Sequence, residues 1–186
     1  MTIFSEETTL LVKNWDNVKE ILDAEKRLRK QLTGFLLSLE GDLTKTTWWK
    51  KQWIFGQVSD SEVFISKSNW QVGDDKYALC IGVEGFIPGN LFGSDPDANL
   101  YVWGQKEQTR LVEKLREKFK SDNTIDLGEL NNKGKGTYII KQSLPQCLPE
   151  EIDNFENFAR KKILDHFGFY AQVTSKYSRL IARSIK

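Results

Sequence analysis

The 186-residue sequence has few of the residue types that most often perform chemistry. It contains one histidine and two cysteines, so any catalytic triad or imidazole base would have to use His166. Cys80 and Cys147 form no CxxC pair, and with a single histidine they are too few for a structural zinc site. We therefore expect no catalytic residues, no cofactor and no metal site in this chain.

Long apolar runs and an export signal are also missing. No stretch approaches the roughly eighteen consecutive apolar residues of a membrane-spanning helix. The first ten residues, MTIFSEETTL, lack the basic and apolar regions of a signal peptide. These absences predict a cytoplasmic protein with two reduced thiols, of which Cys80 is expected to be buried and inert.

Proline is scarce, with four residues, and no repeat or Ser/Gly/Pro-rich linker divides the chain. The length then favours a single α+β domain over residues 1–186. The chain has 27 basic and 26 acidic side chains, which excludes a strongly basic, histone-like protein. Its two parts differ, because residues 1–100 carry 11 basic and 15 acidic groups and residues 101–186 carry 16 and 11.

Residues 5–40 predict one long helix. Ser5 suits the N-cap, and Glu6 and Glu7 suit the positive end of the helix dipole. We expect Gly41-Asp42 to end the helix. Apolar residues at helical spacing form one stripe, which Glu25 interrupts: Leu11, Val18, Ile21, Leu28, Leu32, Phe35 and Leu39. Because this stripe is longer than a small sheet can cover, it predicts a protein partner or self-association, with a homodimer formed through this helix.

Residues 48–142 predict a sheet with one inserted helix. Trp48–Val58 and Glu62–Trp70 flank Ser59-Asp60-Ser61, a hairpin pattern. Tyr77–Phe86 is apolar on both faces, as in a central strand. The remaining elements are expected in this order: a polar loop at 88–98, a short strand at 100–103, a helix at 105–120, and two short strands around 131–134 that end at 136–141.

Residues 149–186 predict two C-terminal helices. Pro149 suits the first turn of a helix that runs to Phe167, Gly168 is expected to break it, and a last helix starts at Tyr170. On the first of these helices, His166 is expected at the core edge with a hydrogen-bond partner. The element order indicates an α+β fold, with an antiparallel or mixed sheet and the N- and C-terminal helices packed on it.

An aromatic cluster has two interpretations. Its members fall within 23 residues: Trp48, Trp49, Trp53, Phe55, Phe64 and Trp70. With Lys50 and Lys51 between the rings, the cluster could be a platform for stacked nucleobases. Rings on both faces of the strands indicate instead that the cluster covers the sheet as core, which is the interpretation we favour.

The last helix carries a basic stripe, with Lys176, Arg179, Arg183 and Lys186 spaced three, four and three residues apart. Such a stripe could contact phosphates or an acidic partner, although charged stripes usually face water. Together with Lys50, Lys51 and Trp53, these residues are the candidate contacts for nucleic acid or a partner.

Carboxylates offer a weaker third possibility. Asp74-Asp75-Lys76 has the Asp-x-Lys spacing of metal-dependent nucleases, but it precedes its strand and has no clear partner acid. With Glu84, these acids would be the candidates for a divalent-metal enzyme.

The segment WWKKQWIFGQVSDSEVFISKSNWQVGDDKYALCIGVEGF resembles the region after the nuclease core in some bacterial PD-(D/E)XK-like defence proteins. The resemblance covers roughly residues 45–120 and includes an aromatic strand, a Trp-bearing strand and a strand of IGVE type. It implies an accessory or recognition module of a prokaryotic or phage conflict system. The nuclease core has no counterpart here, so no catalytic residue is carried over.

Three hypotheses follow, in order of preference. The first is a non-enzymatic binding module that meets a protein partner or a second copy. The alternative is a nucleic-acid binder that uses the basic helix and the exposed aromatic residues. The last is a metal-dependent enzyme.

Overall fold

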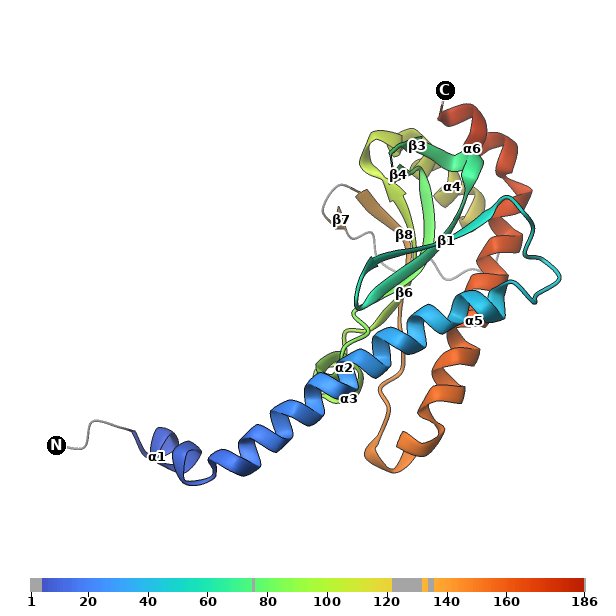
Figure 1. The fold of residues 1–186 in the computed structure, drawn as a ribbon. Coiled ribbons are helices and arrows are strands. Elements are labelled where there is room, and N and C mark those ends of the chain that lie inside the picture. Colours follow the sequence, from blue (N-terminus) through green and yellow to red (C-terminus); the bar gives the residue numbers. More distant parts are fainter. Residues whose placement is uncertain (1–4, 75, 122–131, 134–135, 186) are drawn as a thin grey trace.

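The computed structural model describes residues 5–74, 76–121, 132–133 and 136–185 and has an α+β fold, which confirms the predicted class (Figure 1). Its centre is a six-stranded sheet in the order β1-β2-β5-β6-β8-β7, in which neighbouring strands pair antiparallel. Within the described ranges, no helix has the length and apolar character needed to cross a membrane.

The N-terminal segment forms two helices, α1 (Glu6–Lys13) and α2 (Trp15–Leu43), so the prediction of one helix over residues 5–40 is wrong at Asn14. The Asn14 side-chain amide donates to the Leu10 carbonyl at 2.9 Å, and its backbone leaves the helical region at φ −114°. Asparagine competes in this way with the helical backbone hydrogen bonds. The Ser5 cap is confirmed, since its hydroxyl accepts a hydrogen bond from the Thr8 N–H. The predicted end at Gly41-Asp42 is wrong, because α2 continues to Leu43.

The predicted hairpin is confirmed, with β1 (Trp53–Ser59) paired to β2 (Glu62–Lys67). Both strands are shorter than expected, because residues 48–52 precede β1 and Ser68–Trp70 form a 3₁₀ turn, η1. A second, small sheet follows, made of β3 (Gln71–Gly73) and β4 (Lys76–Tyr77).

The predicted central strand is also confirmed, because every residue of β5 (Leu79–Glu84) is buried between β2 and β6 (Asn99–Gln105). At the other edge, β7 (Asn132–Lys133) pairs with the start of β8 (Gly136–Ser143), as the predicted hairpin requires; Gly134 and Lys135 lie outside the described residues. The expected loop at 88–98 contains a short helix, α3 (Pro88–Phe92). A turn, η2 (Lys106–Gln108), precedes α4 (Thr109–Lys120).

The C-terminal helices differ from the prediction in where they break. After the turn η3 (Pro149–Asn154), α5 (Phe155–Lys176) runs unbroken through Gly168, and the break falls at Tyr177, before α6 (Ser178–Ser184). A Cβ at position 168 would lie 3.1 Å from the indole nitrogen of Trp48. Glycine therefore serves here to give Trp48 room, rather than to end the helix.

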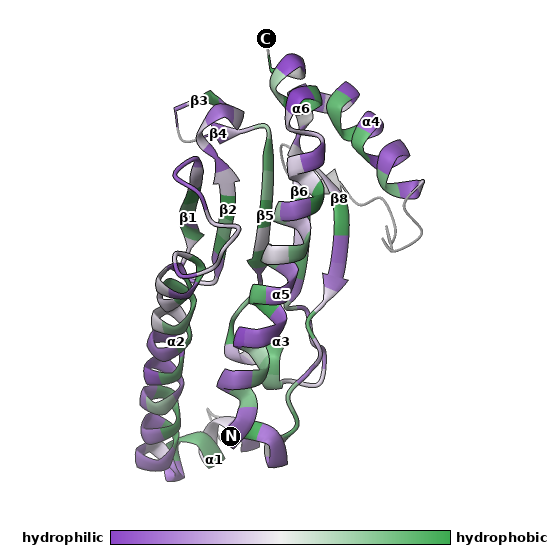
Figure 2. Ribbon diagram, turned by 90° about the vertical axis from the view of Figure 1, so that its right-hand side faces the viewer, coloured by the Kyte–Doolittle hydropathy of each residue, from purple (hydrophilic) through white to green (hydrophobic). Residues whose placement is uncertain are grey.

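Among the described residues, helices pack on one face of the sheet only, and Figure 2 shows α5 in front of the strands with α6 at its upper end. Strand residues that point toward these helices are fully buried aliphatic side chains: Val63, Ile65, Ile81, Val83 and Val102. Four tryptophans, at 48, 49, 53 and 70, pack against one another in the same core. The core interpretation of the aromatic cluster is confirmed for these four.

Two polar side chains connect this helical layer to the sheet backbone. His166 of α5 lies with Nε2 3.0 Å from the Tyr101 carbonyl oxygen, which confirms the expected hydrogen bond. Burial lowers the pKa of His166 to about 4, so the imidazole is neutral near pH 7 and donates from Nε2–H. Arg116 of α4 donates to the Tyr138 carbonyl at 3.3 Å, and burial lowers the pKa of its guanidinium.

Lys67 at the end of β2 is a buried cation in the helix-covered core, 2% exposed. Its ammonium donates to the hydroxyls of Ser175 and Ser178 at 2.9 and 3.1 Å. It also lies over the rings of Trp53 and Trp70, 4.7 and 5.0 Å from their centroids. Burial lowers the pKa of Lys67. The tryptophan cluster thus surrounds a charge that it shields from water.

Candidate functional site

The first candidate surface is the N-terminal arm, defined here as residues 5–31, which precede the first buried residue of α2, Leu32. Figure 1 shows α1 and the first part of α2 projecting away from the sheet. Apolar side chains on this arm are largely exposed, with Ile21 at 68%, Trp15 at 55% and Leu22 at 52%. Val18 and Ile21 continue the helical stripe that is buried further along as Leu32, Leu36, Leu39 and Leu43.

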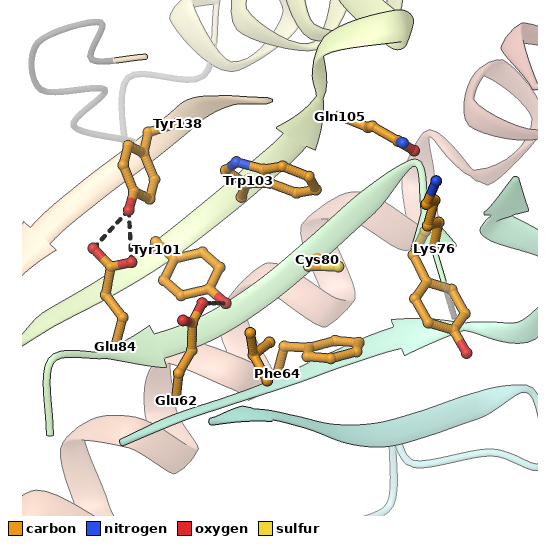
Figure 3. Close-up of a pocket in the computed structure, with 11 residues that line it drawn as sticks. Glu62, Phe64, Lys76, Cys80, Glu84, Tyr101, Trp103, Gln105 and Tyr138 are labelled. Atoms are coloured by element: carbon orange, nitrogen blue, oxygen red, sulfur yellow. Dashed lines mark hydrogen bonds between the residues drawn. The ribbon is translucent and has the colours of Figure 1, made fainter. Parts of the chain in front are cut away.

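The second candidate surface is the face of the sheet on which no described helix packs. There, a separate cluster of buried residues contains one side chain from each of β2, β5, β6 and β8: Phe64, Cys80, Tyr101 and Tyr138. Tyr77 and Trp103 pack against it. Together with side chains around them these residues line a cavity of about 300 Å³, called here the open-face pocket (Figure 3). This volume lies at the lower end of the range for small-molecule sites.

Glycines allow three of the pocket rings to lie close against the sheet. Phe64 lies over Gly56 and Tyr101 over Gly82, which are their cross-strand partners, and Trp103 lies over Gly136. A Cβ at any of these glycines would come within 2.1–2.4 Å of a ring atom. The rings therefore occupy the space of the missing side chains, and glycine in these strands marks close approach.

Two tyrosine–carboxylate pairs lie at one end of the pocket, as Figure 3 shows. The Tyr101 hydroxyl donates to Glu62 at 2.9 Å, and the Tyr138 hydroxyl lies 2.6 Å from both carboxylate oxygens of Glu84. Burial and the neighbouring carboxylate charges raise the pKa of both tyrosines, so both hydroxyls stay protonated. Lys76 lies at the opposite end of the pocket.

Cys80 lies on the pocket floor between these two ends. It is a free thiol, 6% exposed, which confirms that it is buried. Burial raises its pKa, and the charge of Glu62 raises it further. The thiolate, the reactive form, is therefore suppressed.

The sequence-predicted contact residues differ in their exposure. Lys50 and Lys51 are exposed before β1, whereas Trp53 is 6% exposed in the helix-covered core, where its ring is not available for stacking. The basic stripe is divided by the break at Tyr177, with Lys176 ending α5, and Arg179 and Arg183 on α6; all three are exposed. Lys186 lies outside the described residues.

The carboxylates named for a metal site are dispersed. Asp74 is exposed in the turn between β3 and β4, Glu84 is buried at the end of β5, and Asp75 lies outside the described residues. Within the described part of the chain, no three His, Cys, Asp or Glu side chains form a group that could hold a metal ion.

Comparison with known proteins gives no guide to function: no family model, no curated protein and no solved structure matches this chain.

Sequence reasoning missed the open-face pocket. Only Phe64 of its rings belonged to the aromatic cluster, and Glu84 was considered only as a metal ligand. A signal was present in the glycines inside predicted strands, Gly56 and Gly82, since strand glycines often mark close contacts. Using that signal requires the strand register, which places Gly56 opposite Phe64 and Gly82 opposite Tyr101.

Proposed function

We propose that this protein is a non-enzymatic interaction module that pairs with a second copy of itself through the N-terminal arm. The observation that carries the proposal is the exposed apolar stripe of the arm. Trp15, Ile21 and Leu22 are each more than half exposed, on the same helix whose later turns form the core. An exposed apolar stripe on an extended helix is typical of a protein interface.

Charge on the arm favours a second copy as the occupant. Residues 5–25 carry six acidic and two basic side chains, whereas residues 26–30 carry four basic side chains and no acidic one. If two arms lie antiparallel, the acidic part of each faces the basic part of the other. In a dimer with twofold symmetry, the usual arrangement of homodimers, this contact between an acidic and a basic part occurs twice.

Glu25, the charged residue within the stripe, is compatible with such an interface. Its carboxylate accepts a hydrogen bond from Nε of Arg29, one turn further along the helix. The pair presents a neutral polar patch rather than an isolated charge, so its burial between two arms costs less than the burial of a lone carboxylate. Such a polar position within an apolar seam also helps to fix the register of two helices.

Light scattering after size-exclusion chromatography tests the proposal on the full chain. We expect a dimer at tens of micromolar, and a monomer for the double variant Ile21→Glu/Leu22→Glu. Leu37→Glu is the matched control, because Leu37 is an exposed leucine of the same helix outside the arm, and it should remain dimeric. A strictly monomeric wild-type chain at this concentration contradicts the proposal.

Charge reversal tests the antiparallel arrangement. Glu20→Lys/Asp23→Lys and Arg27→Glu/Arg29→Glu should each weaken self-association by like-charge repulsion, and an equimolar mixture of the two variants should recover a mixed dimer. If the mixture does not associate better than either variant alone, two copies do not pair in this way.

Nucleic-acid binding is the second candidate, supported by the exposure of Lys50, Lys51, Arg179 and Arg183. Binding of this kind would weaken steeply with salt and fall in Arg179→Glu/Arg183→Glu. No measurable affinity for DNA or RNA at low salt would contradict it.

A cytoplasmic location belongs to the same proposal, as does the accessory role in a conflict system that the resemblance of residues 45–120 implies.

A further inference from the structure

We infer that the open-face pocket binds an organic cation, an ammonium or guanidinium group carried on an apolar or aromatic body. The inference rests on the cavity, the orientation of its rings and the charges at its two ends, and it does not depend on self-association of the arm.

The rings give the pocket a floor suited to a cation. Because Phe64, Tyr101 and Trp103 lie over glycines, they are held flat along the sheet and do not stand up from it. The faces of aromatic rings carry partial negative charge, and cations bind over them. Tyr101 and Tyr138 meet edge to face, with centroids 5.8 Å apart, so a face and an edge are both present at the acidic end.

The acidic end supplies the charge that selects a cation. Glu62 and Glu84 line the pocket there, while among the described lining residues Lys76 supplies a single positive charge at the far end. Lys141 lies 4.0 Å from Glu84 and 3.8 Å from Asp97, so part of the Glu84 charge is already compensated. Glu62 lines the pocket and is half-buried beside Tyr101, more exposed than Glu84, so it is the carboxylate we choose to test for ligand binding.

The same charges disfavour anionic ligands. A nucleotide would bring its phosphates toward Glu62 and Glu84, where like charges in a partly enclosed cavity repel strongly. The remaining lining residues determine which ligand body fits. The rings of Phe64 and Tyr77 pack together, with centroids 5.7 Å apart, and form an apolar wall between the acidic end and Lys76.

Two sources can supply this chemistry, a free amine or a cationic side chain of a peptide. Calorimetric or NMR titration with phenethylammonium represents the first, and titration with N-acetyl-trimethyllysine amide the second. Either probe should bind saturably at low-millimolar concentration, and the tighter of the two identifies the source. Phenylacetate, which has a similar ring and a carboxylate, is the matched ligand control and should not bind.

Variants then locate the binding site. Glu62→Gln should weaken binding of the cation by about tenfold or more, because the substitution removes the carboxylate charge but keeps the shape of the side chain. Glu113→Gln, on the exposed face of α4, is the matched control and should leave affinity unchanged. If Glu62→Gln does not fold, Trp103→Leu takes its place and should also lose affinity.

Three results would overturn the inference. They are phenylacetate binding as tightly as phenethylammonium, the absence of saturable binding of both cations to the folded wild-type chain, and unchanged affinity in folded Glu62→Gln. Titration of the Ile21→Glu/Leu22→Glu variant keeps this test separate from the arm, since the pocket should bind equally well in that variant.

Discussion

The two faces of the sheet use the same strands for different purposes. On the helix-covered face, Val63, Ile81 and Val102 are fully buried aliphatic residues that pack against α-helices. The side chains of their immediate neighbours Phe64, Cys80 and Tyr101 point to the other face, where they line the open-face pocket. Because side chains alternate along a strand, one set can supply stability while the other is available for binding.

The largest test of this comparison is to remove one tryptophan from each face. Trp70→Ala should cost about 3–5 kcal/mol of unfolding free energy, because Trp70 is fully buried in the helix-covered core. Trp103→Ala on the open face should cost about 2 kcal/mol of unfolding free energy, since that ring is only half-buried beside a cavity. Urea unfolding of both variants measures the difference, and equal costs would contradict the division between the faces.

A pH titration tests the connection between the faces at His166. The pKa of His166 in the folded protein is about 4, below its ordinary value of 6.5, so the unfolded chain takes up a proton first as pH falls. The contribution to stability is fully present above pH 6.5 and decreases as pH falls toward 4, by about 3 kcal/mol in total.

The matched variant for this titration is His166→Gln, which keeps a side-chain N–H for the Tyr101 carbonyl but does not titrate. Carboxylates contribute equally to both proteins, so the comparison isolates the imidazole. Equal slopes of stability between pH 6.5 and 4 in the two proteins would show that His166 is not the cause.

A smaller effect is expected from filling the space under a pocket ring. Gly82→Ala places a Cβ 2.3 Å from the Tyr101 ring and should cost about 1–3 kcal/mol while reducing cation binding. Gly34→Ala is the control, because no atom lies within 4 Å of a Cβ there. Because Gly34 is exposed within a helix, this control should increase the free energy of unfolding by about 0.5–1 kcal/mol. If Gly82→Ala keeps both stability and binding, the close packing of ring on glycine has no role.

The smallest change is expected for Lys67, the buried cation of the covered face. Replacing it with methionine removes a desolvated charge and keeps most of the apolar stem, so stability should change by about 1 kcal/mol or less. Thermal unfolding measures this. A loss above about 3 kcal/mol would instead assign the ammonium group, with Ser175 and Ser178, a structural role.

Local signals in the sequence predicted local structure well. Ser5, the turn at 59–61 and the apolar run at 77–86 each act through nearby residues, so the cap, the hairpin and the central strand could be found without tertiary information. The breaks were predicted wrongly because they depend on distant contacts or on side-chain competition. Gly168 continues a helix since it accommodates Trp48, and Asn14 interrupts one by bonding back to Leu10.

The candidate site was harder to predict than the fold. The exposed arm followed from the length of its apolar stripe, yet the pocket depends on register. Tyr101 and Glu62 are 39 residues apart in sequence, and Tyr138 and Glu84 are 54 apart. No spacing rule within one strand could have paired them, because each pair comes from strands separated by a third strand, β2 with β6 and β5 with β8, and both sheet order and register are needed to bring them together.

The carbonyl oxygens of Tyr101 and Tyr138 are both held from behind the sheet, by His166 and Arg116. These are the two tyrosines whose hydroxyls reach the pocket carboxylates, so each is restrained at its backbone and at its tip. An incoming ligand therefore meets a cavity whose shape is already set. Little conformational entropy should be lost on association, and affinity should depend on how well the ligand fits rather than on rearrangement of the protein.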